Sequence, residues 1–147
     1  MREREPGNQY KVLFKAAAER LRDAELMRTF LDRIVRWMEC RALMGPICVN
    51  VEERIRAAGD EPWVDEGGIS GVILLSTSHV ALHTWPLREK AVLDAYSCRP
   101  YDFDILRDAL RLHYDPHTMT IYDLSNALEW DACNTGVTTE ALDGEGT

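Results

Sequence analysis

Apolar side chains recur along this chain with two periods, one typical of helices and one typical of strands. Over residues 19–39 and again over 102–114 they stand three or four positions apart, which places them on one face of a helix. Asp102 is expected to cap the second helix and Pro116 to end it, because proline lacks the amide hydrogen that a further turn requires. Over residues 47–51 apolar and polar positions alternate, as in a strand with one buried face.

Short apolar runs bounded by glycine, proline or small polar residues predict the remaining strands. They cover residues 10–17, 69–76, 79–85, 91–97 and 118–124. Residues 52–67 are polar and rich in glycine, and we interpret them as a connection with one helical turn at most. The order β-α-β-β-β-β-α-β favours an α+β fold, a two-layer sandwich in which two helices cover one face of a mainly antiparallel sheet.

A chain of 147 residues fits one domain with one core. We expect this domain to occupy residues 1–124, beginning with a loose arm over 1–9. Residues 125–147 lose the apolar periodicity and gain glycine, threonine and acidic residues. This change predicts a mobile C-terminal tail with a short helix near Leu128.

Residues 86–90 are predicted to turn the chain between two neighbouring strands. A regular hairpin about the middle of this turn would pair Trp85 with Ala91. The same register would place Ser78 opposite Cys98, provided that the ladder contains no bulge. The sequence therefore predicts a contact between this serine and this cysteine.

The composition narrows the expected partners and location. A net charge of −8 and a pI near 5.0 argue against a nucleic-acid partner. No apolar run approaches the roughly 18 residues that a membrane span needs, and residues 1–9 are charged where a signal peptide would be apolar. The cysteines show no CxxC spacing, as in a protein with reduced thiols; they are Cys40, Cys48, Cys98 and Cys133. We therefore expect a cytoplasmic protein without membrane or nucleic-acid partners.

The segment 68–98 gathers serines, two histidines and a cysteine into the least polar part of the chain. It contains GISGV at 68–72, SxSH at 76–79, HTWP at 83–86 and a cysteine fifteen residues after the second histidine. These motifs and their spacing resemble the small prokaryotic S-adenosylmethionine decarboxylases. The resemblance is dense over 68–98 and diffuse elsewhere.

The resemblance implies a proenzyme that cuts its own chain before an internal serine and converts that serine to a pyruvoyl group. Here the cut would fall between Thr77 and Ser78, giving chains 1–77 and 78–147. Decarboxylation leaves an electron pair on carbon, which ordinary side chains cannot accept. The pyruvoyl group from Ser78 would accept it after forming a Schiff base with a small amine-bearing substrate. The resemblance also implies the α+β sandwich, and a homodimer in which two cleaved protomers pair sheet to sheet.

Three further residues take roles through this resemblance. His83 would move protons during self-cleavage, a task that suits an imidazole near neutral pH, and Ser70 would work with it. Cys98 would donate a proton to the carbanion after carbon dioxide leaves. Ser70 and Ser78 have even numbers and His83 an odd one, so a regular strand would not place all three on one face. We therefore expect a bulge or a break at Ser78.

Two departures from the family pattern concern the cut and the substrate. The family usually has glutamate before the serine, where this chain has Thr77, but the cut uses the backbone carbonyl of that residue. It also usually has glutamate after HTWP, resembling the residue that holds the ribose hydroxyls of S-adenosylmethionine, where this chain has Leu87. Leucine accepts no hydrogen bond, so Glu89 or another acid would replace it, or the substrate lacks ribose.

S-adenosylmethionine, used for polyamine (spermidine) synthesis, is the preferred substrate, and arginine or ornithine is the alternative. A further alternative is an uncleaved relative that acts as a binding or regulatory subunit. A metal site formed by His79, His83 and Cys98 is a weaker alternative, because no CxxC or HExxH motif accompanies these residues and we expect no metal.

Overall fold

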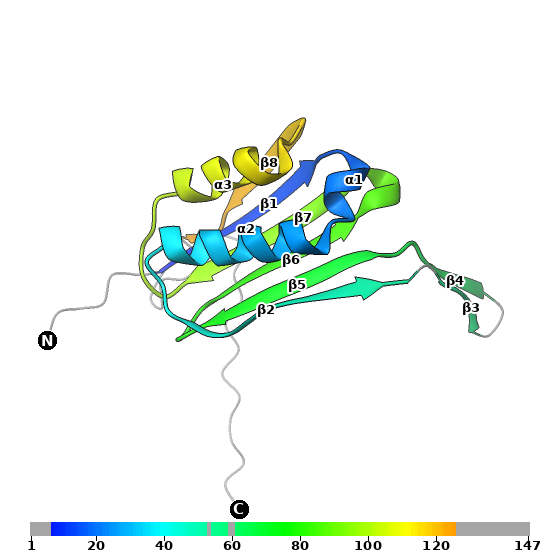
Figure 1. Cartoon of the computed structure of the whole chain (residues 1–147), viewed down its shortest axis with the longest axis horizontal. Helices are drawn as coiled ribbons and strands as arrows, with labels where there is room; N and C mark the ends of the chain where they lie inside the picture. Colours follow the sequence, from blue (N-terminus) through cyan, green and yellow to red (C-terminus); the bar gives the residue numbers. More distant parts are fainter. Residues whose placement is uncertain (1–6, 53, 59–60, 126–147) are drawn as a thin grey trace, which may run out of the picture.

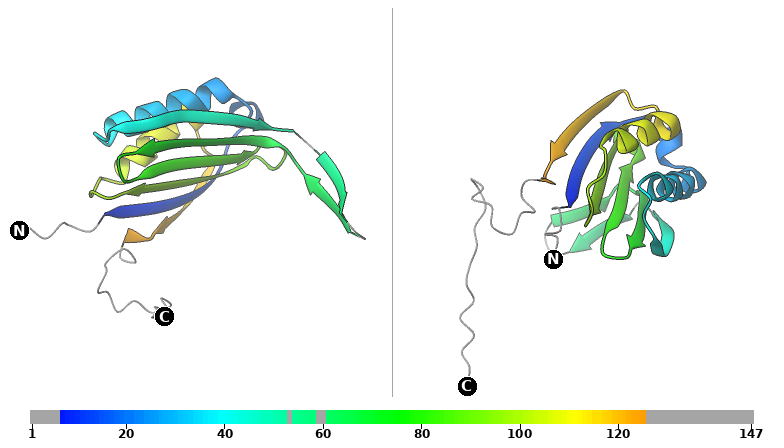
Figure 2. Two further views of the ribbon diagram at one scale, coloured as in Figure 1. Left: turned by 90° about the horizontal axis from the view of Figure 1, so that it is seen from below. Right: turned by 90° about the vertical axis from the view of Figure 1, so that its left-hand side faces the viewer.

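The protein consists of a six-stranded sheet with helices on one of its faces (Figures 1 and 2). This computed structural model describes residues 7–52, 54–58 and 61–125. All strand pairs in the sheet are antiparallel, in the order β2-β5-β6-β7-β1-β8. The strands are β1 (Asn8–Lys15), β2 (Ala42–Val51), β5 (Gly68–Leu75), β6 (His79–Trp85), β7 (Lys90–Ser97) and β8 (Thr118–Asp123). The predicted α+β sandwich is confirmed.

The helical layer consists of α1 (Ala18–Leu21), α2 (Ala24–Trp37) and α3 (Asp104–Tyr114). The single helix predicted over 19–39 is divided in two, because the Asp23 carboxylate accepts a hydrogen bond from the Leu26 amide at 3.0 Å and begins a new helix. Helix α3 begins at Asp104, slightly later than predicted, so Phe103 and not Asp102 is its N-cap, although the Asp102 carboxylate accepts a hydrogen bond from the Asp104 amide. The helix ends at Tyr114, two residues before Pro116.

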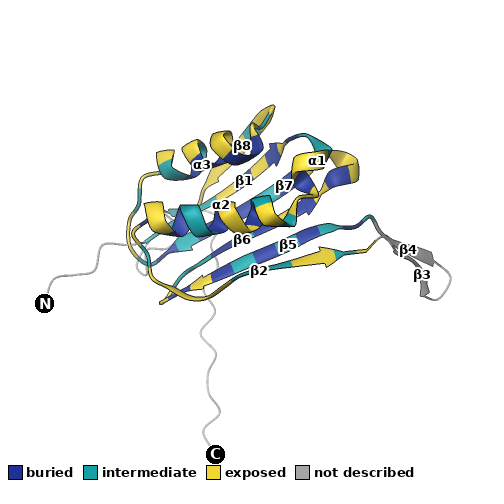
Figure 3. Ribbon diagram, viewed as in Figure 1, coloured by how far each residue is buried: buried dark blue, intermediate teal, exposed yellow. Residues whose placement is uncertain are grey.

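One hydrophobic core fills the space between the two layers (Figure 3). Along β5, β6 and β7 every second side chain points into this core, and the intervening side chains form the opposite face of the sheet, which we call the outer face. The helices supply the other half of the core with the apolar faces that the sequence predicts. Their buried residues include Met27, Phe30, Leu31, Ile34, Leu106 and Leu110.

Two predicted segments differ from the structure. Strand β2 begins at Ala42 instead of 47 and continues past Gly45-Pro46 with register irregularities, which an edge strand tolerates. Residues 52–67 are not a helical connection, because they contain a hairpin of β3 (Arg54–Ala58) and β4 (Glu61–Asp65). This hairpin extends beyond one end of the main sheet (Figure 1).

The turn between β6 and β7 is one residue tighter than predicted. It consists of a single 3-10 turn, η1 (Pro86–Arg88), followed by Glu89 in the left-handed conformation with a φ of 51°. Trp85 therefore pairs with Lys90 and not with Ala91. Because a shift of one residue moves a side chain to the other face of a strand, Trp85 and Lys90 share the outer face.

Strand β1 begins at Asn8, inside the arm predicted over 1–9. The predicted helix near Leu128 and all but the first residue of the predicted tail over 125–147 lie outside the described residues. Within the described part of the chain, no helix is long and apolar enough to cross a membrane.

Candidate active site

Ser70 and His83 face each other across strands β5 and β6. They are direct cross-strand partners, and the Ser70 Oγ atom lies 2.8 Å from His83 Nδ1. We expected a bulge or a break at Ser78, and the structure has the break, a turn between the end of β5 at Leu75 and the start of β6 at His79. In this pair even positions of β5 face odd positions of β6, so no bulge is needed to join the two side chains on the outer face.

Thr77, Ser78 and Cys98 form a second cluster at the turn between β5 and β6. The Leu75 amide donates a hydrogen bond to the Ser78 carbonyl at 2.9 Å and closes this turn. The Ser78 Oγ atom accepts a hydrogen bond from the Cys98 amide at 2.8 Å, and the Thr77 hydroxyl donates to Cys98 Sγ at 2.8 Å. The predicted contact between Ser78 and Cys98 is thus confirmed, although the hairpin register on which it rested was off by one residue.

This second cluster lines a small cavity of about 190 Å³ at the end of the sheet. Two arginines that the sequence analysis did not single out, Arg41 and Arg99, line the same cavity. Arg99 is held in place because its amide donates to the Ser97 hydroxyl at 3.2 Å and its guanidinium donates to the Glu39 carbonyl at 3.3 Å. Only the fold could reveal these arginines, since they lie far apart in the sequence and belong to no motif.

The two clusters lie toward opposite ends of strand β6. Ser78 directly precedes this strand, whereas His83 lies five residues further on. At a rise of about 3.3 Å per residue, this spacing separates them by roughly 16 Å along the strand. That distance is too long for direct proton transfer within one chain, so a single protomer does not bring Ser70 and His83 to Ser78.

A buried threonine anchors the part of the sheet that carries Ser70 and His83. Thr84 is 3% exposed; its hydroxyl accepts a hydrogen bond from the Ile69 amide at 3.0 Å and donates one to the Leu21 carbonyl at 2.9 Å. Gly68 makes this close approach of β5 to β6 possible. It has a φ of 139°, and a Cβ atom at this position would lie 1.9 Å from the Thr84 carbonyl oxygen.

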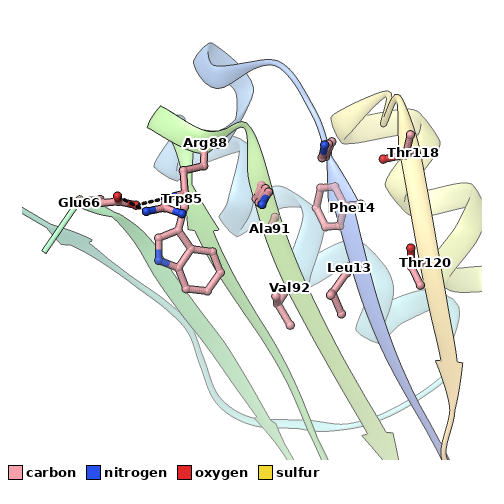
Figure 4. A pocket seen from close by; sticks show the side chains of 11 residues that line it. Leu13, Phe14, Glu66, Trp85, Arg88, Ala91, Val92, Thr118 and Thr120 are labelled. Atoms are coloured by element: carbon pink, nitrogen blue, oxygen red, sulfur yellow. Dashed lines mark hydrogen bonds and ion pairs between the residues drawn. The ribbon is translucent and has the colours of Figure 1, made fainter.

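An acidic residue does stand beside Leu87, the position where the family usually has glutamate. The Glu66 carboxylate forms a bidentate ion pair with the guanidinium of Arg88, with N–O distances of 2.5 and 2.6 Å (Figure 4). Glu66 and Leu87 both line a cavity of about 300 Å³. The hydrogen bond from Arg88, with a smaller effect from the charge of Lys90, holds the pKa of Glu66 below its usual range.

The histidines considered as metal ligands do not lie together with other ligands. His79 Nε2 lies 4.0 Å from a carboxylate oxygen of Asp94, whereas His83 is bonded to Ser70. Over residues 7–52, 54–58 and 61–125, no group of three His, Cys, Asp or Glu side chains could hold a metal ion.

The α+β sandwich and the serine that lies at a strand-to-strand turn against a cysteine both agree with the family resemblance of the sequence. A family model described as S-adenosylmethionine decarboxylase matches residues 12–126, which is most of the chain. The chain belongs to the S-adenosylmethionine decarboxylase family.

The names of two relatives give different substrates. The chain is 31% identical over 68 residues to an S-adenosylmethionine decarboxylase proenzyme of Thermomicrobium roseum, covering 46% of this chain and 59% of that protein. It is 39% identical over 67 residues to an arginine decarboxylase proenzyme of Caldivirga maquilingensis, covering 42% of this chain and 48% of that protein. The chain thus spans about half of the length of these two curated relatives.

A solved structure supports the fold over a longer range. The adenosylmethionine decarboxylase from Aquifex aeolicus aligns with 90% of this chain and 100% of its own chain, with a TM-score of 0.62. The sequence identity is 18%, so this likeness shows the fold alone.

Proposed function

We propose that this protein is a self-processing decarboxylase whose pyruvoyl group is formed from Ser78. Family membership and the word proenzyme in the names of its relatives support this proposal. The observation that carries it is the position of the Thr77–Ser78 peptide directly against Cys98: the Thr77 hydroxyl donates to Cys98 Sγ, and the Cys98 amide donates to Ser78 Oγ.

The cut requires the Ser78 oxygen to bond to the Thr77 carbonyl carbon while the peptide C–N bond breaks. This leaves an ester and a free Ser78 amine. Elimination then removes the proton from Ser78 Cα and breaks the bond between Ser78 Cβ and the ester oxygen, so Thr77 leaves with a carboxylate. Water releases ammonia from the remaining enamine to give the pyruvoyl group. The Cys98 amide, which donates to Ser78 Oγ, would stabilise negative charge on that oxygen as its proton leaves.

The residues around Ser78 fit a pyruvoyl group. When present, that group supplies a carbonyl that accepts the substrate amine and then the electron pair released by decarboxylation. The Cys98 thiol lines the same small cavity as Ser78, where it can hold and deliver one proton. In the uncut chain the Thr77 hydroxyl donates to this sulfur, and the cut would release Thr77 from it.

The roughly 16 Å between the two clusters favours a homodimer in which each protomer completes the site of the other. In such a dimer, His83 of the partner subunit would take the Ser78 proton, and Ser70 of the partner subunit would orient that imidazole. The outer face supports this pairing because it exposes large apolar side chains along β2 and β5. These include Met44, Ile47, Val49 and Leu74, each between 42 and 56% exposed.

Two sets of variants test the cut and its dependence on pairing. Ser78→Ala should leave an intact chain, whereas Ser76→Ala, in the same turn, should still be cut. His83→Ala should cleave slowly by itself. Coexpression with the Ser78→Ala chain should restore cleavage of the His83→Ala chain, because the Ser78→Ala protomer retains an intact histidine. Unchanged slow cleavage in the mixture would contradict the proposed exchange of residues between protomers.

S-adenosylmethionine is the proposed substrate, in cytoplasmic spermidine synthesis, with Glu66 replacing the acceptor that Leu87 cannot provide. Arginine or ornithine is the second candidate, favoured by Leu87 itself and by the arginine decarboxylase among the relatives. Release of labelled carbon dioxide from each carboxyl-labelled substrate distinguishes them. Glu66→Gln should raise KM for the true substrate at least several-fold. If the unaltered chain stays uncut, it would instead be a binding or regulatory subunit.

A further inference from the structure

A cavity of about 430 Å³ opens on the outer face near the η1 end of the sheet. Its apolar floor consists of Trp85, Val92 and Leu13, which project from three adjacent strands (Figure 4). Trp85 and Leu13 are 37 and 39% exposed, so part of each side chain is available for contact. The hydroxyl groups of Thr118 and Thr120 line the side formed by β8. The volume is within the range of small-ligand sites in proteins.

The charged residues of this cavity are mostly cations. Lys15, Lys90 and Arg88 line it together with one acid, Glu66. The bidentate ion pair with Arg88 already neutralises Glu66, so the two lysines leave an excess of positive charge. This local excess is notable in a chain whose net charge is −8.

The two lysines also oppose each other directly across strands β1 and β7. Lys15 and Lys90 are cross-strand partners, and both are exposed on the outer face. Like charges in directly opposed positions destabilise an antiparallel pair. An anion between the two ammonium groups would remove this repulsion and form charge-assisted hydrogen bonds with both.

We infer that this cavity binds a small organic anion with a flat or apolar body. The body lies on Trp85, Val92 and Leu13, and a carboxylate or phosphate lies between Lys15 and Lys90. If the outer faces pair as proposed above, the lysines become covered and need a counter-charge still more. This cavity shares no lining residue with the one at Ser78, and Glu66 is the one lining residue that the proposed function also uses.

Titration calorimetry on the full-length chain in a chloride buffer tests this inference with three probes. Phenyl phosphate combines a ring with an anion, inorganic phosphate has the charge alone, and benzylamine has a similar ring with the opposite charge. Phenyl phosphate should bind saturably with a dissociation constant below about 1 mM, and inorganic phosphate should bind more weakly. Benzylamine should not bind.

Matched variants locate the binding site. Lys15→Gln and Lys90→Gln should each weaken phenyl phosphate about tenfold, the effect of losing one charge-assisted hydrogen bond. Lys11→Gln is the control, because Lys11 lies on the same strand and face but opposes Asp94 and does not line the cavity. Trp85→Leu should weaken phenyl phosphate but leave inorganic phosphate unchanged.

Three results would overturn the inference. One is an equal loss of affinity in Lys11→Gln and Lys15→Gln, which would indicate general surface charge. Another is equal binding of benzylamine and phenyl phosphate. The third is that Lys15→Gln or Lys90→Gln dissociates a dimer but leaves the affinity for the probes unchanged. That result would mean that carboxylates of a second copy of this chain fill the cavity.

Discussion

The hydrogen bonds of Thr84 predict a large loss of stability when this threonine is replaced by valine. Valine has nearly the same shape, so the change leaves no cavity and removes only the hydroxyl group. It leaves the buried Ile69 amide without its acceptor and the Leu21 carbonyl without its donor. Each buried polar group that loses its partner costs about 1–3 kcal/mol, and the added methyl group recovers about 0.8 kcal/mol, so for the two groups we expect a net loss of about 1–5 kcal/mol. That is a large fraction of the roughly 5–15 kcal/mol that stabilises a typical domain.

Urea unfolding measures this loss, provided that the chain is uncut and its concentration is fixed. We would therefore make both variants in the Ser78→Ala background, since cleavage or a change in dimerisation would alter the apparent stability. Thr120→Val is the control, because Thr120 is exposed on the outer face and its replacement should change stability by less than about 0.5 kcal/mol. Equal unfolding midpoints for Thr84→Val and Thr120→Val would refute the anchoring role of the Thr84 hydroxyl.

Three further predictions concern the site. Cys98→Ala should still cut its chain but release carbon dioxide about 100-fold more slowly, as expected for loss of a general acid; normal turnover would exclude Cys98 as the proton donor. Ser70→Ala should slow self-cleavage about tenfold, because His83 loses its hydrogen-bond partner, and a time course of chain cleavage would measure this. Because the pKa of Glu66 is lowered, its ion pair with Arg88 is present at neutral pH and is lost as the pH falls through that pKa. Arg88→Gln should return the Glu66 pKa toward its usual range in an NMR titration, and an unchanged value would contradict the ion pair.

Much of the fold follows from local patterns in the sequence. The strand β6 occupies the predicted residues, and the buried faces of α2 and α3 carry the predicted apolar residues, because regular alternation and helical spacing report directly on burial. The hairpin of β3 and β4 was missed because its glycine and proline residues were interpreted as a loop. The register at Trp85 was missed because it depends on the conformation of one turn residue, Glu89, and no pattern in the flanking strands reports on that conformation.

The site could be predicted only in part. Motif spacing singled out Ser70, Ser78, His83 and Cys98, and the structure joins them in two pairs. The separation between the pairs depends on strand length and pairing, so the motif could not reveal it. The ion pair of Glu66 and Arg88 also depends on tertiary contact, because it joins residues on either side of the hairpin of β5 and β6.

The central claim is that the chain cuts itself before Ser78 and makes a pyruvoyl group from that serine. Intact-protein mass spectrometry on the purified full-length chain tests this claim most directly. The account predicts two masses, corresponding to residues 1–77 and 78–147, with the second fragment lighter by one ammonia than a chain that begins with serine. A single mass for the uncut 147-residue chain would contradict it.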